Sequence, residues 1–335
     1  MKKISVLFMA LLFTFVLFGC EDNDTDSENV VYTTTYPLYY LLEEIGKDVI
    51  EVKYVPGSQV HGDSHDWSQK EIIDMQDADY LFYVGAGLDP FIRTNVDSVF
   101  RDQHVELVKL EDYIDIIEVK LTHDHDHGDD HDDHDDHDDH DDHDDHDDHD
   151  SGHTEILPDP HFWLDVSRMQ EAAKTILEKL IVMYPEKDTV LENNYVTIDK
   201  LLEKLNQDFV DALSGQDKPI VTNVKLFTYF EEAYGINIHP LTLNAHSHED
   251  ETVPTDLEDF VNFVINHELH YILFEKNANS PAGETLVSEV NKTGHDVEKL
   301  FLHPIGNITT AELNDNENYI TLMYDNLDSL KKALD

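Results

Sequence analysis

The sequence predicts an α/β protein of two lobes, each a mostly parallel sheet covered by helices. Strand-like runs of β-branched and aromatic residues alternate with helix-like segments between residues 30 and 185. The alternation restarts at 215 and continues to 335. Between the two stretches, Val190–Leu213 has heptad-like spacing. A helix of about 24 residues would be about 36 Å long, which suits a linker between two lobes. We therefore expect an N-terminal lobe over 30–185, a linker helix over 186–214 and a C-terminal lobe over 215–335.

Strands in the first half are expected at Val30–Thr35, Ile50–Val55, Tyr80–Gly85 and His104–Leu110. Helices are expected over Tyr36–Gly46, after the Ser68/Glu71 capping-box pattern, and over Met169–Tyr184. Because strands and helices alternate, the sheet should be parallel, with its ligands beyond the carboxyl ends of its strands.

Strands in the second half are expected at Pro219–Val224, Ile236–Leu243, Tyr271–Lys276 and Val297–Pro304. Thr255/Glu258 and Thr309/Glu312 are further capping-box patterns, and Tyr319–Leu334 should close the chain as a helix. The two halves are thus expected to have the same architecture, with a ligand site in the cleft between them.

The first 29 residues predict export and membrane attachment. Lys2 and Lys3 precede an apolar or small run from Ile4 to Gly19, which is short for a membrane span and typical of a secretory signal. The run ends in "LFGC", which resembles the bacterial lipoprotein cleavage box. We expect a signal peptide over 1–19, lipidation of Cys20 and a flexible tether over 20–29, with a plain signal peptide or an uncleaved anchor as the alternative.

Charge and cysteine content exclude several classes of protein. The formal net charge is −51, and the 17 aspartates of 123–150 supply only part of it. Phosphate binding needs clustered Lys and Arg, so a nucleic-acid partner is not expected, whereas cations suit such a field. Cys20 is the single cysteine, which rules out an internal disulfide and a cysteine-based zinc site.

Candidate metal ligands follow the predicted strands. Imidazole and carboxylate groups suit Zn²⁺ and Mn²⁺. The candidates are His61 and His65 in "PGSQVHGDSHDW", His161 in "DPHFWLD", His246 and His248 in "LNAHSHEDE", and Glu275 in "ILFEK". A lone loop histidine is usually a surface residue, but a carboxylate that ends an apolar strand needs a partner.

Four motifs extend these candidates over nearly the whole chain after the tether. "TTTYPLYYLLEEIG", "DADYLFYVGAGLDPF", "DPHFWLD" and "ILFEKNANSPAGETLVSEV" resemble, in this order, the metal-binding receptor family of bacterial ABC importers, and its zinc branch above all. The resemblance implies two α/β lobes joined by a long helix, one Zn²⁺ in the cleft, and an ABC permease and ATPase as partners. It also implies a monomer outside the cytoplasm, held to the cell membrane by its lipid.

The resemblance transfers His161 and Glu275 directly as ligands. The first histidine stays open, because spacing from Pro56-Gly57 selects His61 and the following "HDW" selects His65. Where the family has its third histidine, this chain has Val224, which cannot coordinate a metal. We hypothesise that His246 or His248 replaces that ligand; the alternative is a three-ligand site closed by water.

The Asp/His tract between 123 and 153 cannot fold alone, because it buries no apolar surface and repels itself. Near neutral pH most of its imidazoles are available as weak ligands. We interpret it as a low-affinity zinc reservoir, against the alternative of a repeat without a selected role. The histidines that we interpret as its weak ligands are His123, His125, His127, His131, His134, His137, His140, His143, His146 and His149.

The leading functional prediction is a zinc receptor that is not an enzyme. A zinc hydrolase is the enzymatic alternative, and the chain contains no H-E-x-x-H pair that would support it. Three nitrogens and one carboxylate favour Zn²⁺, and more oxygen ligands would favour Mn²⁺. The loss of a histidine weakens the preference for Zn²⁺, and the Asp/His tract restores it. The alternatives are therefore a manganese-type receptor, or a surface adhesin or metal-sequestering lipoprotein.

Overall fold

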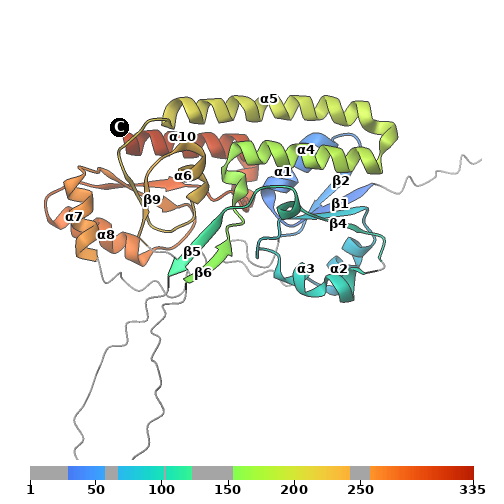
Figure 1. Ribbon diagram of the computed structural model, residues 1–335, viewed down its shortest axis with the longest axis horizontal. Coiled ribbons are helices and arrows are strands. Elements are labelled where there is room, and N and C mark those ends of the chain that lie inside the picture. Colours follow the sequence, from blue (N-terminus) through green and yellow to red (C-terminus); the bar gives the residue numbers. More distant parts are fainter. Residues whose placement is uncertain (1–28, 57–66, 102, 123–153, 242–256) are drawn as a thin grey trace, which may run out of the picture.

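The computed structural model describes residues 29–56, 67–101, 103–122, 154–241 and 257–335. Two α/β lobes lie side by side beneath the long helix α5 (Asp188–Leu213), as Figure 1 shows. This confirms the predicted fold class.

The N-lobe contains a four-stranded parallel sheet in the order β2-β1-β3-β4. A separate antiparallel hairpin, β5–β6, follows it. Its elements are β1 (Val30–Thr33), α1 (Tyr36–Gly46), β2 (Glu51–Tyr54), α2 (Gln69–Gln76), β3 (Tyr80–Tyr83), α3 (Pro90–Asn95), a π-helical turn (Val96–Phe100), β4 (Glu106–Lys109), a 3-10 turn (Leu110–Asp112), β5 (Glu118–Thr122), β6 (Thr154–Pro158), a 3-10 turn (Phe162–Leu164), α4 (Val166–Met183) and a 3-10 turn (Pro185–Lys187).

The C-lobe contains a second four-stranded parallel sheet in the order β10-β9-β7-β8. Counted from β8, this is the strand order of the N-lobe. Its elements are β7 (Ile220–Thr222), α6 (Thr228–Tyr234), β8 (Ile238–Pro240), α7 (Leu257–Asn266), β9 (Tyr271–Glu275), α8 (Pro281–Lys292), β10 (Glu298–Leu302), α9 (Thr310–Asn314) and α10 (Tyr319–Leu334).

Helix α5 is hydrogen-bonded to both lobes. Near its start, Asn194 Nδ2 donates to the carbonyl oxygens of Ile45 and Lys47, 3.1 and 3.0 Å away in the N-lobe. Near its end, Asp208 Oδ2 accepts from the hydroxyl of Tyr324 in the C-lobe at 2.7 Å. One face of the helix is buried, as its spacing predicts, so α5 fixes both lobes to a common support.

The lobes also touch directly beneath α5. The buried Trp163 donates from Nε1 to the carbonyl oxygen of Pro304 at 2.8 Å. The hydroxyl of Tyr319 donates to the carbonyl oxygen of Trp163 at 2.7 Å, and Tyr36 N donates to Gly306 O at 3.2 Å. One cluster of buried apolar side chains runs through both lobes, so the interface is an extension of the core.

All eight predicted strands are present. Among the described residues, one sheet was not predicted: the β5–β6 hairpin, in which β5 comes before the Asp/His tract and β6 comes after it. The capping boxes Ser68/Glu71 and Thr309/Glu312 are confirmed, each with its two reciprocal hydrogen bonds. Thr255 lies outside the described residues.

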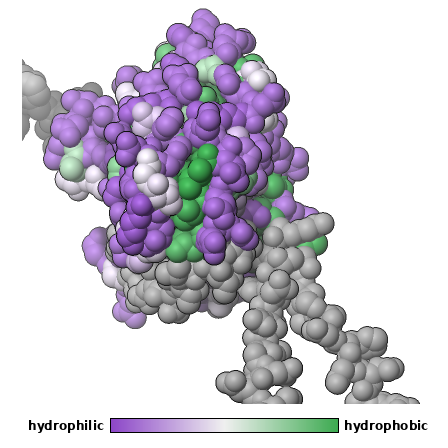
Figure 2. All heavy atoms as spheres, turned by 90° about the vertical axis from the view of Figure 1, so that its left-hand side faces the viewer, coloured by the Kyte–Doolittle hydropathy of each residue, from purple (hydrophilic) through white to green (hydrophobic). Residues whose placement is uncertain are grey.

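The surface of the C-lobe end is mostly hydrophilic, with a narrow hydrophobic stripe between hydrophilic side chains (Figure 2). This agrees with the large excess of acidic over basic residues. Of the helices in the described ranges, none combines the length and the apolar character that a membrane crossing requires.

Candidate metal centre

His161 is a buried histidine held by a carboxylate. Its side chain is 2% exposed, and it lies between β6 and the 3-10 turn that leads into α4. Asp159 Oδ1 is 2.7 Å from His161 Nδ1 and also accepts from the His161 backbone N at 3.0 Å. With Nδ1 donating to the carboxylate, Nε2 carries the lone pair. A histidine oriented by a carboxylate is the usual arrangement of a metal ligand and its supporting group.

The surroundings of His161 fix the ring further. Trp163 meets it edge-on, with ring centroids 5.2 Å apart. Tyr229, on helix α6 of the C-lobe, donates its hydroxyl proton to the carbonyl oxygen of Asp159 at 2.7 Å. The turn that carries His161 is therefore held from both lobes.

Glu275 ends strand β9 of the C-lobe, as predicted, and is 2% exposed. Its backbone N donates to Asn223 Oδ1 at 2.8 Å. Asn223 is itself buried and follows β7, and its backbone N donates to Leu273 O at 2.9 Å. Asn223 thus ties the ends of two neighbouring strands together and holds the main chain at Glu275 in place.

Val224 belongs to the core and is 4% exposed. Thr222 Oγ1 donates to its carbonyl oxygen at 3.0 Å, which fixes the turn after β7. A buried isopropyl group offers no donor atom, so this position cannot supply a ligand.

Most other predicted site residues lie outside the described ranges. These are Cys20, His61, His65, His246, His248 and all ten tract histidines from His123 to His149. Among the residues that the structure does describe, no three His, Cys, Asp or Glu side chains are grouped so as to hold a metal ion. His161 and Glu275 are the two candidate ligands that can be placed.

The strands that precede the undescribed candidate ligands occupy equivalent positions in the two sheets. His61 and His65 follow β2 in the chain, and His246 and His248 follow β8. β2 and β8 occupy the same position in their sheets, each parallel to the first strand of its lobe. Since parallel strands end at one edge, both loops start from the sheet edges where a cleft site would draw ligands.

Asp89 is a buried carboxylate to which the sequence analysis gave no role. It follows β3 in "GAGLDPF" and is 4% exposed. Burial raises its pKa to about 6, while the hydrogen bond from Gly85 N to Asp89 Oδ2 at 3.0 Å, together with the nearby Thr34 hydroxyl and Val84 amide, opposes the shift. The one sequence signal was a carboxylate just after an apolar strand, which also marks Glu275.

The histidines without an assigned partner find neighbours in the structure. His270 stacks on His295 with ring centroids 5.3 Å apart and planes 7° from parallel. His270 is exposed. His303 is 4% exposed, and its Nε2 lies 3.2 Å from Glu312 Oε1.

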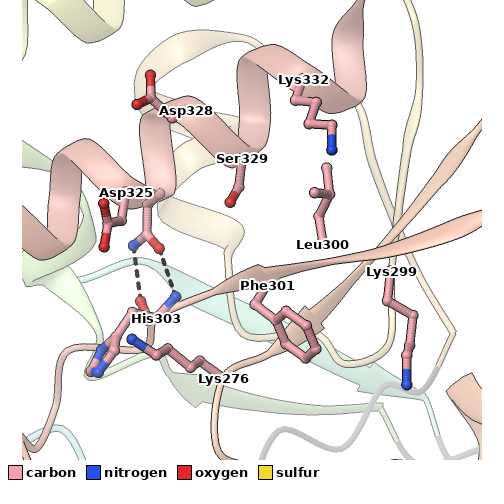
Figure 3. Close-up of a pocket in the computed structure, with 10 residues that line it drawn as sticks. Lys276, Lys299, Leu300, Phe301, His303, Asp325, Asp328, Ser329 and Lys332 are labelled. Atoms are coloured by element: carbon pink, nitrogen blue, oxygen red, sulfur yellow. Dashed lines mark hydrogen bonds between the residues drawn. The ribbon is translucent and has the colours of Figure 1, made fainter.

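A pocket of about 410 Å³ lies between β10 and α10 (Figure 3). Three lysines and His303 line it together with acidic and apolar side chains, but neither His161 nor Glu275 does. Its lining consists of Lys276, Lys299, Leu300, Phe301, His303, Asp325, Asn326, Asp328, Ser329 and Lys332.

Two parallel-sheet lobes joined by a long helix, each with a buried donor side chain, are the features of the class of two-lobed binding proteins. The family model described as zinc-uptake complex component A, periplasmic (ZnuA) matches residues 31–333. The chain belongs to this family.

Curated relatives and a solved structure agree with that assignment. The chain is 25% identical over 338 residues to the zinc-binding lipoprotein AdcA of Streptococcus pneumoniae, covering 100% of this chain and 62% of that protein. It is 28% identical over 321 residues to the high-affinity zinc uptake system protein ZnuA of Bacillus subtilis, covering 94% and 90%. The crystal structure of the Zn(II)-bound ZnuA-like domain of S. pneumoniae AdcA shares the fold, with a TM-score of 0.68, 23% identity, and coverage of 92% and 99%. The chain therefore spans less than two thirds of the AdcA relatives that it matches.

Proposed function

We propose that this protein is an extracytoplasmic receptor that captures Zn²⁺ between its lobes and delivers it to an ABC permease driven by an ATPase. The observation that carries the proposal is the pair of buried donors, His161 held by Asp159 in one lobe and Glu275 at a strand end in the other. Membership of a zinc-uptake family and zinc-binding relatives support the choice of ion.

The proposed coordination set combines described and undescribed residues. His161 would bind through Nε2 and Glu275 through its carboxylate. His61 or His65 would add a second imidazole from the N-lobe loop, and His246 or His248 would take the place that Val224 cannot fill. Imidazole nitrogens with one carboxylate suit Zn²⁺ better than Mn²⁺.

Such a site binds an ion for transport and does not process a substrate. A catalytic zinc needs an open coordination position and a general base beside it. Here the carboxylate of Glu275 would itself be a ligand. We therefore propose a binding protein, not an enzyme.

The receptor function also gives roles to the N-terminal segment, the linker helix and the Asp/His tract. We propose lipidation at Cys20 after a signal peptide over 1–19, and a tether over 20–29. The lobes over 30–185 and 215–335 would be joined by the linker helix over 186–214, in a monomer at the outer face of the membrane. The tract over 123–153 would raise the local zinc concentration near the cleft.

The test is the zinc stoichiometry and affinity of the chain from Cys20 onward with residues 123–150 deleted. One tightly bound Zn²⁺ per protein, preferred over Mn²⁺ in competition, is the expected result. Tight manganese binding instead would identify a manganese-type receptor. Loss of all tight binding would refute the cleft site and leave the tract as the zinc-binding element.

A further inference from the structure

Lys276 is the first residue beyond strand β9 and directly follows the proposed ligand Glu275. Its backbone N donates to Leu302 O, at the end of β10, at 2.8 Å. Its side-chain Nζ lies 3.1 Å from Glu312 Oε1. Because Lys276 and Glu275 are neighbours in the chain, whatever fixes Lys276 also limits where the Glu275 carboxylate can lie.

Glu312 connects Lys276 to His303. The Oε1 atom that pairs with Lys276 also lies 3.2 Å from His303 Nε2. The other oxygen, Oε2, accepts from Thr309 N at 2.9 Å and from its hydroxyl at 2.8 Å. Glu312 is 9% exposed, and hydrogen bonds to a buried charged group are among the stronger ones in proteins. We call Lys276, Glu312 and His303 the Lys276 network.

His303 shapes the segment that follows it. Its Nδ1 accepts a hydrogen bond from Ile305 N at 2.9 Å, and Ile305 has a φ of 58°, which a β-branched residue rarely adopts. Two hydrogen bonds, drawn as dashed lines in Figure 3, join Asn326 of α10 to the main chain of His303. His303 N donates to Asn326 Oδ1 at 2.6 Å, and Asn326 Nδ2 donates to His303 O at 2.9 Å. Side chains thus keep this segment in an unfavourable backbone conformation.

Residues 304–307, here called the interlobe loop, make several of the direct contacts with the N-lobe. Pro304 O accepts from Trp163 Nε1 at 2.8 Å, and Gly306 O accepts from Tyr36 N at 3.2 Å. Asn307 Oδ1 accepts from the hydroxyl of Tyr54 at 2.9 Å. Trp163 in turn packs against the ring of His161.

The contacts therefore run without a break from one proposed ligand to the other. They pass from Glu275 through the Lys276 network to the interlobe loop, and from the loop through Trp163 to His161. A chain of packed and hydrogen-bonded groups is a physical route for coupling, and mutational coupling is the evidence that would establish it.

We propose that Lys276, Glu312 and His303 are positioning residues for metal binding. They hold Glu275 and the interlobe loop in one geometry, so that zinc binding and the contact between the lobes stabilise each other. By reciprocity, breaking the network weakens zinc binding even though none of its members touches the ion. This inference rests on the proposed function.

The first test is Glu312→Gln, which keeps the shape of the side chain and removes its charge. Zinc affinity is measured on the full chain in chelator buffers whose free zinc is too low to load weak tract sites. Trp163 fluorescence reports binding, and Trp67 is the one other tryptophan. The expected loss of affinity is about tenfold or more, the usual effect of removing a group that orients a ligand, together with faster zinc release.

Matched variants separate positioning from general stability. Glu284→Gln breaks the Lys299–Glu284 pair, 2.6 Å long, in the same lobe, and should leave zinc affinity unchanged. Lys276→Met should repeat the loss seen with Glu312→Gln, and Lys276→Arg should retain binding. Urea unfolding of each variant checks that it is folded.

A double-mutant cycle with Trp163→Phe tests the coupling itself. The Phe ring keeps the packing and loses the hydrogen bond to Pro304. Because this substitution removes the fluorescent reporter, all affinities in the cycle are measured by competition with a chromogenic chelator. If the network acts through the interlobe loop, the combined loss of affinity differs from the product of the single losses by more than about twofold. If the effects of the two substitutions in the cycle are independent, or if Glu312→Gln and Lys276→Met bind zinc as tightly as the wild type, this inference is wrong and the proposed function still stands. A wild-type chain that binds no zinc in these buffers would refute the proposed function and the inference with it.

Discussion

The two lobes share a strand order but carry their buried donor side chains at different places in that order. The N-lobe offers an imidazole, His161, on a turn after the hairpin, oriented by Asp159. The C-lobe offers a carboxylate, Glu275, at the end of β9, with its main chain fixed by Asn223. The topologically equivalent strand in the N-lobe, β3, is followed by Asp89, whose carboxylate is buried within its own lobe. Sheet topology thus determines where buried carboxylates arise, and local hydrogen bonding determines how each donor side chain is held.

The largest effect is expected from His161→Ala. It removes a buried, oriented nitrogen ligand, and zinc affinity should fall by more than about 100-fold, since losing even a group that only supports a ligand costs roughly 10–100-fold. Glu275→Gln should cost less, because an amide oxygen can still coordinate weakly. Competition with a chromogenic chelator measures both. Equal affinity of His161→Ala and the parent chain would contradict the site.

Asp159→Asn tests the orientation of the N-lobe donor by itself. The amide can no longer accept strongly from Nδ1, so the ring loses its fixed tautomer while every ligand remains. We expect a loss of zinc affinity of about 10–100-fold. Asp296→Asn, at an exposed position after His295, is the control and should bind as the parent does. An effect of Asp159→Asn on unfolding alone, without an effect on affinity, would show that Asp159 is only structural.

A pair of histidines follows β2 in the chain and another pair follows β8. Substituting each pair in turn tests whether both segments supply a zinc ligand. His61→Ala with His65→Ala should lower zinc affinity by more than about tenfold, and so should His246→Ala with His248→Ala. If the second pair retains full affinity, the replacement hypothesis fails and water closes a three-ligand site. Single substitutions would then decide which member of an effective pair is the ligand.

The sequence was sufficient for the fold class, the strands and the position of Glu275 at a strand end because these depend on local patterns. Strand alternation, two capping boxes and a carboxylate ending "ILFE" need no knowledge of distant residues. Val224 could be recognised as unable to coordinate for the same reason.

Contacts between distant segments could not be read in this way. The β5–β6 hairpin pairs residues separated by the whole Asp/His tract, and its strands carry weak periodicity. Glu312 was identified from its capping box, yet its bonds to Lys276 and His303 depend on how β9, β10 and α9 pack. Burial of Asp89 likewise depends on tertiary packing that a single sequence does not reveal.

The smallest effect on zinc affinity is expected from Asp89→Asn. This substitution instead tests how the buried Asp89 carboxylate changes the free energy of unfolding with pH. The folded-state pKa of Asp89 is raised to about 6 from an ordinary value near 3.8, so its ionisation destabilises the folded protein as pH rises between these values. The shift corresponds to roughly 3 kcal/mol. Relative to Asp89→Asn, the parent chain should therefore lose about that much free energy of unfolding between pH 4 and pH 7, as measured by urea unfolding.

Glu312 in the C-lobe gives the opposite sign. Burial opposes its ionisation, but hydrogen bonds from Thr309 and Lys276 prevail and lower its pKa to about 2. Its contribution to stability is therefore present above about pH 4.5 and is lost as pH falls towards 2. Glu312→Gln should be less stable than the parent at pH 7, with the difference shrinking on acidification, whereas the Asp89→Asn difference should grow as pH rises from 4 to 6. A pH-independent difference for either variant would show that its carboxylate has an ordinary pKa in the folded protein.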